Sequence, residues 1–540
     1  MTTVRRAILS TLLAATGTLA VQALDFSSLA SVPVQEGGRK KPFLVFADET
    51  MTGLSGLTSV AVEGANRSSV EAVARIWLDP EGWEKQPLIL INSGDLKKSA
   101  GLDAGRKRFS YAELTANEAL RSMIREAASP LGNGPKEKSD PLQKAAMEAG
   151  QRLAAFEGLV SGRALAIVPS GAAAWTPPKA DDPALVKLRA AICSGDQAGF
   201  DAAVRELVAE QAKAPVGFQA DAWKLAVEAF YQRLHPFRWA WVLYLAAGIC
   251  LLALSGGASR VGYAAAWALA IGGFLLQAVG FACRTIVSGR APVTNMYESV
   301  VWVAFGTILF ALVFEAIYRC RYFLLGAVPV AAVSLIIADT QPVILDRSIK
   351  PLVPVLADNF WLTTHVLTIT LSYAAFALAL GLGHIVLGKV IAGRRPSPAL
   401  FNYLYRALQV GVLLLATGTI LGGVWANYSW GRFWGWDPKE TWALIALLGY
   451  LFLLHGRIAG KWGGFGLAVG SVLAFLSVLM AWYGVNFVLG VGLHSYGFGA
   501  GGFPVALAFV FAELAFVGLA LARKNAPGRQ EAVAAGSQAD

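Results

Sequence analysis

Charged residues are scarce in this sequence. Asp, Glu, Lys and Arg make up only 15% of its 540 residues, whereas 55% are hydrophobic. From about residue 239 onward, apolar runs of roughly 20 residues recur, and this length spans a bilayer core. We therefore expect a polytopic α-helical membrane protein. The 46 basic against 36 acidic residues do not indicate nucleic-acid binding, because the basic residues lie mainly in short loops between apolar runs.

Cysteine is also rare, and its spacing excludes several chemistries. The four cysteines form no CxxC, CxxCH or zinc-like pattern. The chain is therefore neither a disulfide scaffold nor itself a c-type cytochrome. We do not expect the thiols of this chain to carry its chemistry.

The N-terminal part differs in character from the rest. Residues 1–23 have a basic start, an apolar stretch and a small-residue ending, which is the layout of a signal peptide or of an uncleaved anchor. Either of them sends residues 24–236 out of the cytoplasm. This segment is polar, with strand-like pieces at 42–46 and 87–92 and a helix-like stretch at 201–211. It predicts an extracytoplasmic, soluble α+β domain.

A multi-span membrane domain is expected over residues 237–524. With the soluble domain outside, alternation of the spans makes residues 525–540 a cytoplasmic tail and places the basic loops inside, as the positive-inside rule requires. This orientation suits a bacterial inner (plasma) membrane. Nine spans are expected, near 239–257, 262–283, 299–318, 322–338, 361–389, 407–426, 440–456, 464–486 and 504–522.

Four of the five histidines lie in or beside these spans. An ionisable side chain in a span is costly and marks a functional site by default, although a neutral imidazole bonded to a neighbouring helix is the alternative for any one of them. Alternation places His365, the loop at Trp430 and His494 on the outer face. The 19 positions from His365 to His384 cover roughly 28 Å of helix, so His384, and likewise His455, lie near the inner face.

The loop after the sixth span is rich in flat rings. Trp430, Trp434 and Trp436 stand beside Gly431 and Gly435, which allow the backbone to approach a planar ligand. Two facing imidazoles can hold a haem iron from both axial positions, and indole rings suit the face of a macrocycle. The loop therefore predicts a shelf for non-covalently bound haem b. The alternative is an interfacial belt of tryptophans, which needs no ligand.

Charged residues in the same loop fit this interpretation. Arg432 or Lys439 can meet the haem propionates. Asp437 and Pro438 have the types expected for the N-cap and the first residue of the next helix. Capping and haem binding are compatible roles.

The segment WGRFWGWDPKETWALI (430–445) resembles the tryptophan-rich WWD signature of the CcsA/ResC haem-handling proteins of System II cytochrome c biogenesis. The related proteins CcmF and CcmC share a looser form of this signature. The resemblance covers most of residues 235–500, in the order of the family's blocks: APVTNMYES (291–299), WLTTHVLTITLSYAAFA (361–377), LHGRIAGKWGG (454–464) and GVNFVLGVGLHSYGFG (484–499).

The resemblance implies that haem passes from the inner side to an external site, where it is offered to an apocytochrome c with a CxxCH segment. His365 and His494 match the external axial ligands, and His455 matches a membrane histidine whose partner in the family lies in a CcsB/ResB component. Residues 1–234 contain no histidine. A separate ResB-like subunit therefore supplies that partner, or His384 does.

The soluble domain then docks the apocytochrome, a thiol-reducing protein or the ResB-like subunit, unless its role is purely structural. For the whole chain, the leading hypothesis is a haem exporter and cytochrome c synthase component that orients haem and needs no general base. There are two other hypotheses. One is a transporter of haem or another amphipathic substrate, supported by broken, glycine-rich spans such as 411–423. The other is a structural subunit of an assembly complex.

Overall fold

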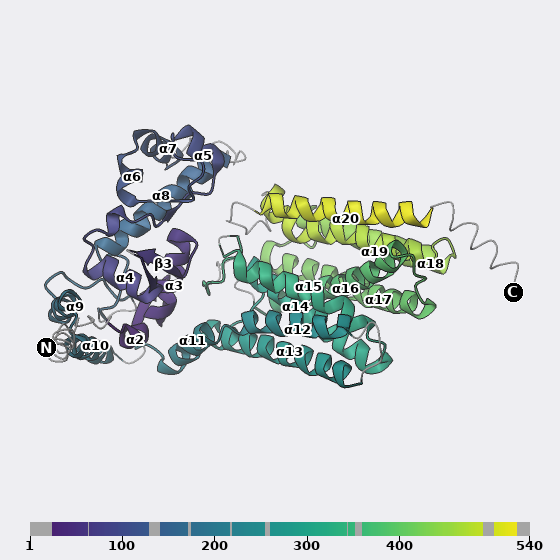
Figure 1. The fold of residues 1–540 in the computed structure, drawn as a ribbon, viewed down its shortest axis with the longest axis horizontal. Coiled ribbons are helices and arrows are strands. Elements are labelled where there is room, and N and C mark those ends of the chain that lie inside the picture. Colours follow the sequence, from purple (N-terminus) through teal and green to yellow (C-terminus); the bar gives the residue numbers. More distant parts are fainter. Residues whose placement is uncertain are drawn as a thin grey trace, which may run out of the picture. The chain divides into compact units, whose positions relative to one another are not determined.

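The computed structural model describes residues 24–62, 64–128, 141–170, 174–215, 219–253, 260–342, 344–351, 359–489 and 502–525. The chain divides into two compact units, and the division falls between Ala229 and Phe230, within helix α11 (Ala222–Leu234). The first unit carries all the described strands, and the second is built of helices (Figure 1). The segments 1–23 and 525–540 lie outside the described residues, apart from Asn525.

The first unit is a helical domain with small strand pairs, as the α+β prediction requires. Its sheets in the described residues are three antiparallel pairs, β1 with β2, β3 with β4 and β5 with β6. Its elements are α2 (Ser27–Ala30), β1 (Pro33–Glu36), β2 (Arg39–Pro42), α3 (Phe43–Ser55), β3 (Ser59–Val62), β4 (Ala65–Ser68), α4 (Ser69–Leu78), η1 (Trp83–Lys85), β5 (Ile89–Leu90), α5 (Gly94–Ser99), β6 (Arg108–Phe109), α6 (Tyr111–Ala116), α7 (Glu118–Ala128), α8 (Pro141–Val160), α9 (Pro183–Ser194) and α10 (Gln197–Ala212).

One of the strand predictions was wrong. Residues 43–46 begin helix α3, while strand β5 within 87–92 and helix α10 over 201–211 are confirmed. The physical reason is periodicity: the buried residues of α3 continue past the apolar run at helical spacing, as Phe43, Phe46, Ala47, Met51 and Leu54. A short apolar run alone does not distinguish a strand from the start of a buried helix.

A buried cation holds the first hairpin of this unit against α3. The ammonium of Lys41 lies 2.7 Å from a carboxylate oxygen of Glu36 and also bonds to Glu49. Burial lowers the pKa of Lys41, but the two carboxylates outweigh burial and leave it above its ordinary value. The ammonium is thus charged at any physiological pH, which suits a buried cation with two anionic partners.

The second unit is a bundle of long helices that run side by side (Figure 1). Within the described residues, nine helical stretches are long and apolar enough to cross a membrane, and they confirm the nine predicted spans. The helices are α12 (Pro236–Ala253), α13 (Arg260–Ser288), α14 (Met296–Tyr318), α15 (Tyr322–Thr340), α16 (Asn359–Ile391), α17 (Pro398–Trp430), α18 (Pro438–Ile458), α19 (Gly464–Leu479) with its π-helical continuation η4 (Met480–Leu489), and α20 (Phe503–Lys524).

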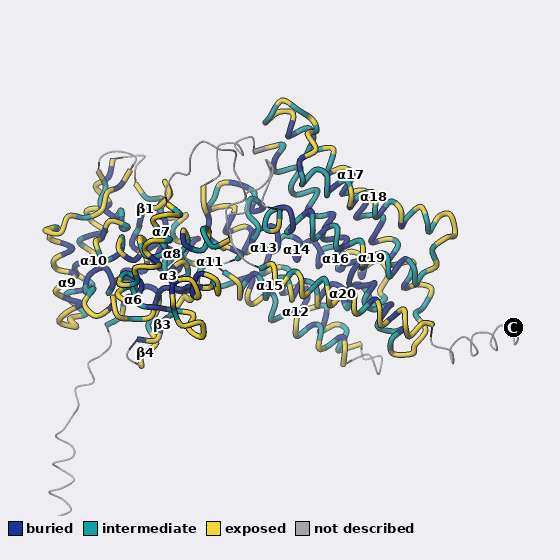
Figure 2. Tube along the Cα trace, turned by 90° about the horizontal axis from the view of Figure 1, so that it is seen from above, coloured by how far each residue is buried: buried dark blue, intermediate teal, exposed yellow. Residues whose placement is uncertain are grey.

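Helix α16 lies at the centre of this bundle. In its most apolar window 72% of the residues are buried, against 22% for α18 and 17% for α20. The dark-blue trace of buried residues follows this difference in Figure 2. The two histidines of α16 therefore lie on the most buried helix of the bundle, whereas few residues of α18 and α20 are buried within the described residues.

Helix α17 packs against α16 along a stripe of glycines. A side-chain Cβ at Gly411, Gly418 or Gly422 would lie within 3 Å of Phe376, Ile369 or His365 respectively. Residue numbers increase along α17 while those of the contacted α16 residues decrease, so the two helices are antiparallel. The short distances show that their backbones lie close together. Helix α17 is unbroken from Pro398 to Trp430. The glycines over 411–423 thus allow close packing and do not mark the broken span that the transporter hypothesis requires.

Candidate haem site

A cavity of about 230 Å³ opens where several helices of the second unit begin or end. It approaches the ~300–1,000 Å³ usual for small-molecule sites. Its walls come from the start of α14 and the segment before it, from α16, from the last turns of α17, from the tryptophan loop with the start of α18, and from η4. The predicted meeting of His365 with the Trp430 loop at one end of the bundle is therefore what the structure shows.

His365 lines this cavity in a defined tautomer. Its Nδ1 lies 2.7 Å from the carbonyl oxygen of Gly418, and a carbonyl only accepts, so Nδ1 carries the proton. The lone pair of a neutral imidazole then resides on Nε2, the state that binds a metal ion. Gly422 lets the ring lie directly on the α17 backbone. The Trp425 ring lies nearly parallel to it, 8° between planes and 6.4 Å between centroids.

The tryptophan loop is organised by one carboxylate. Glu440 accepts hydrogen bonds from the backbone N–H of Gly435 at 2.8 Å and of Asp437 at 3.2 Å, and its other oxygen pairs with Arg432 at 3.2 Å. Asp437 in turn caps α18 by accepting from the N–H of Lys439, which completes a capping box. The predicted cap at Asp437 and Pro438 is confirmed. Glu440, which sequence reasoning did not single out, holds the loop in shape.

The predicted haem-shelf residues separate into two groups. Trp434 and Lys439 line the cavity. Gly435 and Asp437 support the loop through Glu440, and the guanidinium of Arg432 lies over the Trp430 ring, 5.5 Å from its centroid. Trp436 is 68% exposed, and Trp430 packs edge-on against Trp425. These five residues are not among those that line the cavity.

Lys439 lines the cavity, and its ammonium has an open hydrogen-bonding capacity. Within the described part of the chain, its side chain makes no hydrogen bond or ion pair, and Asp437 is the anion that acts on it through space. A lysine in this state can receive a carboxylate. Arg432, the other residue considered for this role, is already engaged with Glu440 and Trp430.

Sequence reasoning did not single out several of the cavity residues. Trp425 comes one turn and a half before the loop, and Trp482 and Asn486 come from η4, whose wide π-helical turns are typical of functional sites. The buried Oδ1 of Asn486 has no hydrogen-bond partner within the described residues. A polar residue in an apolar span was the signal that could have identified Asn486.

The remaining predicted ligands lie elsewhere. His494 falls in residues 490–501, outside the described residues. His384 bonds through Nε2 to Glu513 of α20 at 2.9 Å, and His455 is exposed with Nδ1 bonded to the carbonyl of Leu451, one turn earlier in α18. Within the described residues, His384 and His455 have no hydrogen-bond partner in common. No cluster of three or more metal-binding side chains occurs among the described residues.

Comparison with known proteins identifies the family. Residues 293–494 match the family described as cytochrome c assembly protein, and every cavity-lining residue falls within this range. NrfI of Wolinella succinogenes is 36% identical over 293 residues, which cover 51% of this chain and 31% of NrfI. The cytochrome c haem lyase CcmF is a solved structure with a TM-score of 0.38 and 17% identity, over 53% of this chain and 50% of CcmF. The cytochrome c biogenesis protein CcsA of Guillardia theta is 36% identical over 243 residues, 40% of this chain and 79% of CcsA. The chain belongs to the cytochrome c assembly protein family.

The segment that matches the family lies within the helical unit. The match begins at Val293, in the segment before α14, and ends at His494. The first unit, residues 24–229 in the described chain, lies wholly before it. In this cytochrome c assembly protein, the segment that matches the family therefore contains the whole cavity.

Proposed function

We propose that this protein holds haem b non-covalently at the extracytoplasmic end of its helical bundle and presents it to apocytochrome c for attachment. Its membership in the cytochrome c assembly family supports a role in cytochrome c biogenesis. The observation that carries the proposal further is His365, whose Nδ1 is fixed by Gly418 while the ring lines a cavity with Trp434 and Lys439.

The chemistry of the cavity fits haem as a cargo. A neutral imidazole with its lone pair on Nε2 supplies one axial ligand, and flat aromatic rings with aliphatic side chains suit the macrocycle. Lys439 supplies a cation for a propionate. His494 is the second axial ligand in this proposal, and only four residues separate it in sequence from the end of η4.

The protein's part in attachment is orientation and shielding. Haem carries vinyl groups that form thioether bonds with cysteine thiols, so the reactive groups belong to haem and to the CxxCH segment of the apocytochrome. A site that holds haem by one face and one edge can leave the other edge open to these thiols. In this proposal no general base is required of this chain.

A second haem-binding position is proposed near the other end of α18, shared with a ResB-like subunit. His455 lies on the same exposed face as Ile445, Leu448 and Phe452, at helical spacing. An imidazole on an apolar face of a span is costly unless a partner covers it. His384 is engaged with Glu513, which favours a partner subunit over His384 as the source of the second ligand.

This interface has a direct test. A photo-cross-linking residue at Phe452, on the exposed face of α18, is expected to capture a second membrane protein in the native host. The same residue at the adjacent Leu453, which is buried within the second unit, serves as the matched control and should capture none. Equal yields at both positions would contradict a specific partner on this face.

The function itself is tested by reconstitution. In cells without other cytochrome c assembly proteins, the chain with its partner subunit is expected to attach haem to a reporter with CxxCH, and the purified complex should show a six-coordinate, bis-histidine absorption spectrum. A reporter whose two cysteines are serines is the control. Haem that crosses the membrane without thioether formation would favour a transporter, and a colourless complex would favour a structural subunit.

In this proposal the protein lies in a bacterial inner membrane with its first unit and its tryptophan loop outside and its C-terminus in the cytoplasm. The charge distribution of the loops supports this orientation. A thiol-reducing protein and the apocytochrome are then the partners expected at the outer face.

A further inference from the structure

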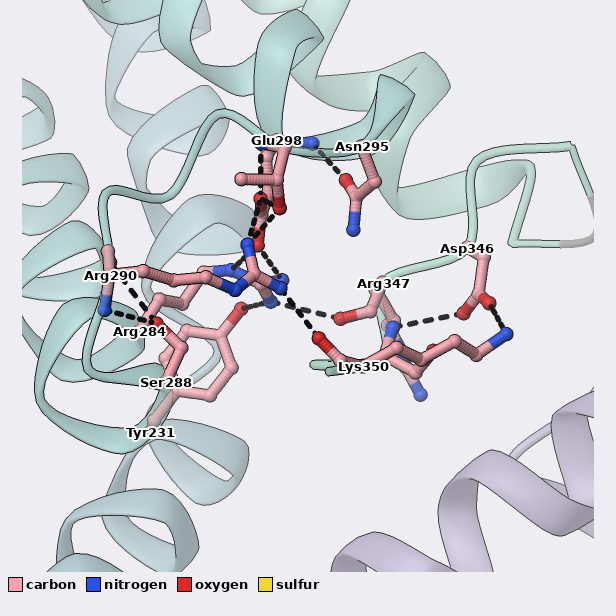
Figure 3. A network of polar contacts seen from close by, with 11 residues as sticks. Tyr231, Arg284, Ser288, Arg290, Asn295, Glu298, Asp346, Arg347 and Lys350 are labelled. Atoms are coloured by element: carbon pink, nitrogen blue, oxygen red, sulfur yellow. Dashed lines mark hydrogen bonds and ion pairs between the residues drawn. The ribbon is translucent and has the colours of Figure 1, made fainter. Parts of the chain in front are cut away.

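A fully buried ion pair lies next to the residues that form one wall of the cavity. The guanidinium of Arg284, near the end of α13, approaches one oxygen of Glu298 with Nη2 at 2.6 Å and Nε at 3.2 Å (Figure 3). Each of the two side chains is only 1% exposed. Burying such a pair gives little net stability compared with apolar residues of the same size, so its presence here requires another explanation.

The other oxygen of Glu298 holds the cavity wall itself. It accepts hydrogen bonds from the backbone N–H of Thr294 at 2.9 Å and from the Thr294 hydroxyl at 3.0 Å. Asn295 caps α14 by accepting from the N–H of Glu298 at 2.7 Å. Thr294, Asn295 and the following Met296 all line the cavity. The carboxylate therefore fixes the backbone that forms this wall.

The wall is linked to a second one through the next residue. The Ser299 hydroxyl accepts a hydrogen bond from the Trp482 indole N–H at 2.9 Å, and both residues line the cavity. Hydrogen bonds thus connect the start of α14 with the π-helical η4, and Glu298 fixes the α14 side of this connection.

On its far side, Arg284 is held by groups away from the cavity. Its Nη1 donates to the Arg347 carbonyl at 2.9 Å and to the Tyr231 hydroxyl at 3.2 Å. Arg290 adds a second guanidinium, which bonds to the Thr294 hydroxyl and to the Lys350 carbonyl (Figure 3). Burial lowers the pKa of Arg290, and Glu298 opposes this effect. The network thereby fastens the wall to residues 347–350.

We propose that Arg284 and Glu298 are positioning residues for the haem bound at His365. They keep the Thr294–Ser299 wall at a fixed distance from the aromatic rings of the cavity, between which the haem binds. This inference rests on the proposed function. Apolar side chains could stabilise the fold equally well, but they cannot accept a hydrogen bond from the Thr294 N–H.

The decisive variant removes both charges together. Arg284→Met with Glu298→Leu removes both fully buried charges, and Arg290, whose guanidinium lies 3.7 Å from Glu298, keeps its bonds to the Thr294 hydroxyl and the Lys350 carbonyl, so the double variant is expected to fold. It should bind haem about 10–100-fold more weakly, the usual effect of losing an outer-shell partner. The g values of its low-spin ferric haem should also shift, because they report the orientation of the axial ligands. Haem titration and electron paramagnetic resonance of the purified full chain measure both.

Two further variants complete the test. Arg238→Met with Asp339→Leu removes another arginine–carboxylate pair of the same unit, which does not line this cavity, and haem binding should stay at the wild-type value. Arg290→Met leaves the Arg284–Glu298 pair intact and should weaken haem binding in the same direction. If the double variant does not fold, the Arg290→Met variant therefore decides whether this network positions the haem.

The possible failures are distinguishable. A wild-type chain that binds no haem overturns the proposed function and this inference with it. A wild-type chain that binds haem, together with Arg284→Met/Glu298→Leu and Arg290→Met variants of unchanged affinity and g values, overturns the inference alone.

Discussion

Replacing His365 by glycine is expected to abolish the six-coordinate haem spectrum and to reduce cytochrome c maturation by more than about a hundredfold, beyond the range seen when an outer-shell partner is lost. The reason is that His365 is the only histidine among the described residues that lines the cavity. The hydrogen bond from its Nδ1 to Gly418 and the packing on Gly422 hold the ring in one orientation. No other histidine among the described residues can therefore take over the same position.

The measurement is an absorption spectrum of the purified complex with a parallel assay of covalent haem in a reporter cytochrome. Free imidazole provides the control, because it can enter the space left by the missing side chain and restore an axial ligand without restoring any other contact. Rescue of the spectrum by imidazole would confirm ligation. A His365→Gly variant that keeps the wild-type spectrum would show that haem is held elsewhere in the molecule.

The sequence predicted the membrane architecture well because that architecture depends on length and hydropathy. A run of about 20 apolar residues forms a helix in a bilayer whatever its neighbours are. Alternation of the spans then brings His365 and the Trp430 loop to one end, as the cavity confirms. The capping box at Asp437 was also accessible, since its signal is local in sequence.

The rest depends on how helices are rotated about their own axes, and the sequence does not give this rotation. His384 and Glu513 are 129 positions apart, and only the packing of α20 against α16 makes them partners. Trp482 reaches the cavity because η4 is π-helical, a local change of pitch without a reliable sequence signal. Trp436 was expected on the shelf; its side chain is largely exposed, and its backbone adopts a left-handed conformation, with φ of 56°, which the sequence does not predict for a tryptophan.

Gly422→Ala is expected to have the second-largest effect. The new Cβ would lie 2.6 Å from Cε1 of His365, closer than non-bonded carbon atoms approach, so the imidazole or the α17 backbone must move. Such overpacking costs about 1–3 kcal/mol of stability. A displaced imidazole should also change the haem spectrum and lower cytochrome maturation. Thermal unfolding, absorption spectra and the reporter assay separate these effects.

Two other glycines of the bundle make this prediction specific. At Gly449 in α18, a methyl group would have no neighbouring atom within 4 Å, so Gly449→Ala should leave the spectrum unchanged and stabilise the helix by about 0.5–1 kcal/mol. Gly411 faces the Phe376 ring on the same α16–α17 contact, but Phe376 does not line the cavity. Gly411→Ala should therefore destabilise the bundle with the haem spectrum intact. If Gly411→Ala and Gly422→Ala change the spectrum alike, the glycine stripe acts only through the spacing of the two helices, and the contact with His365 has no separate role.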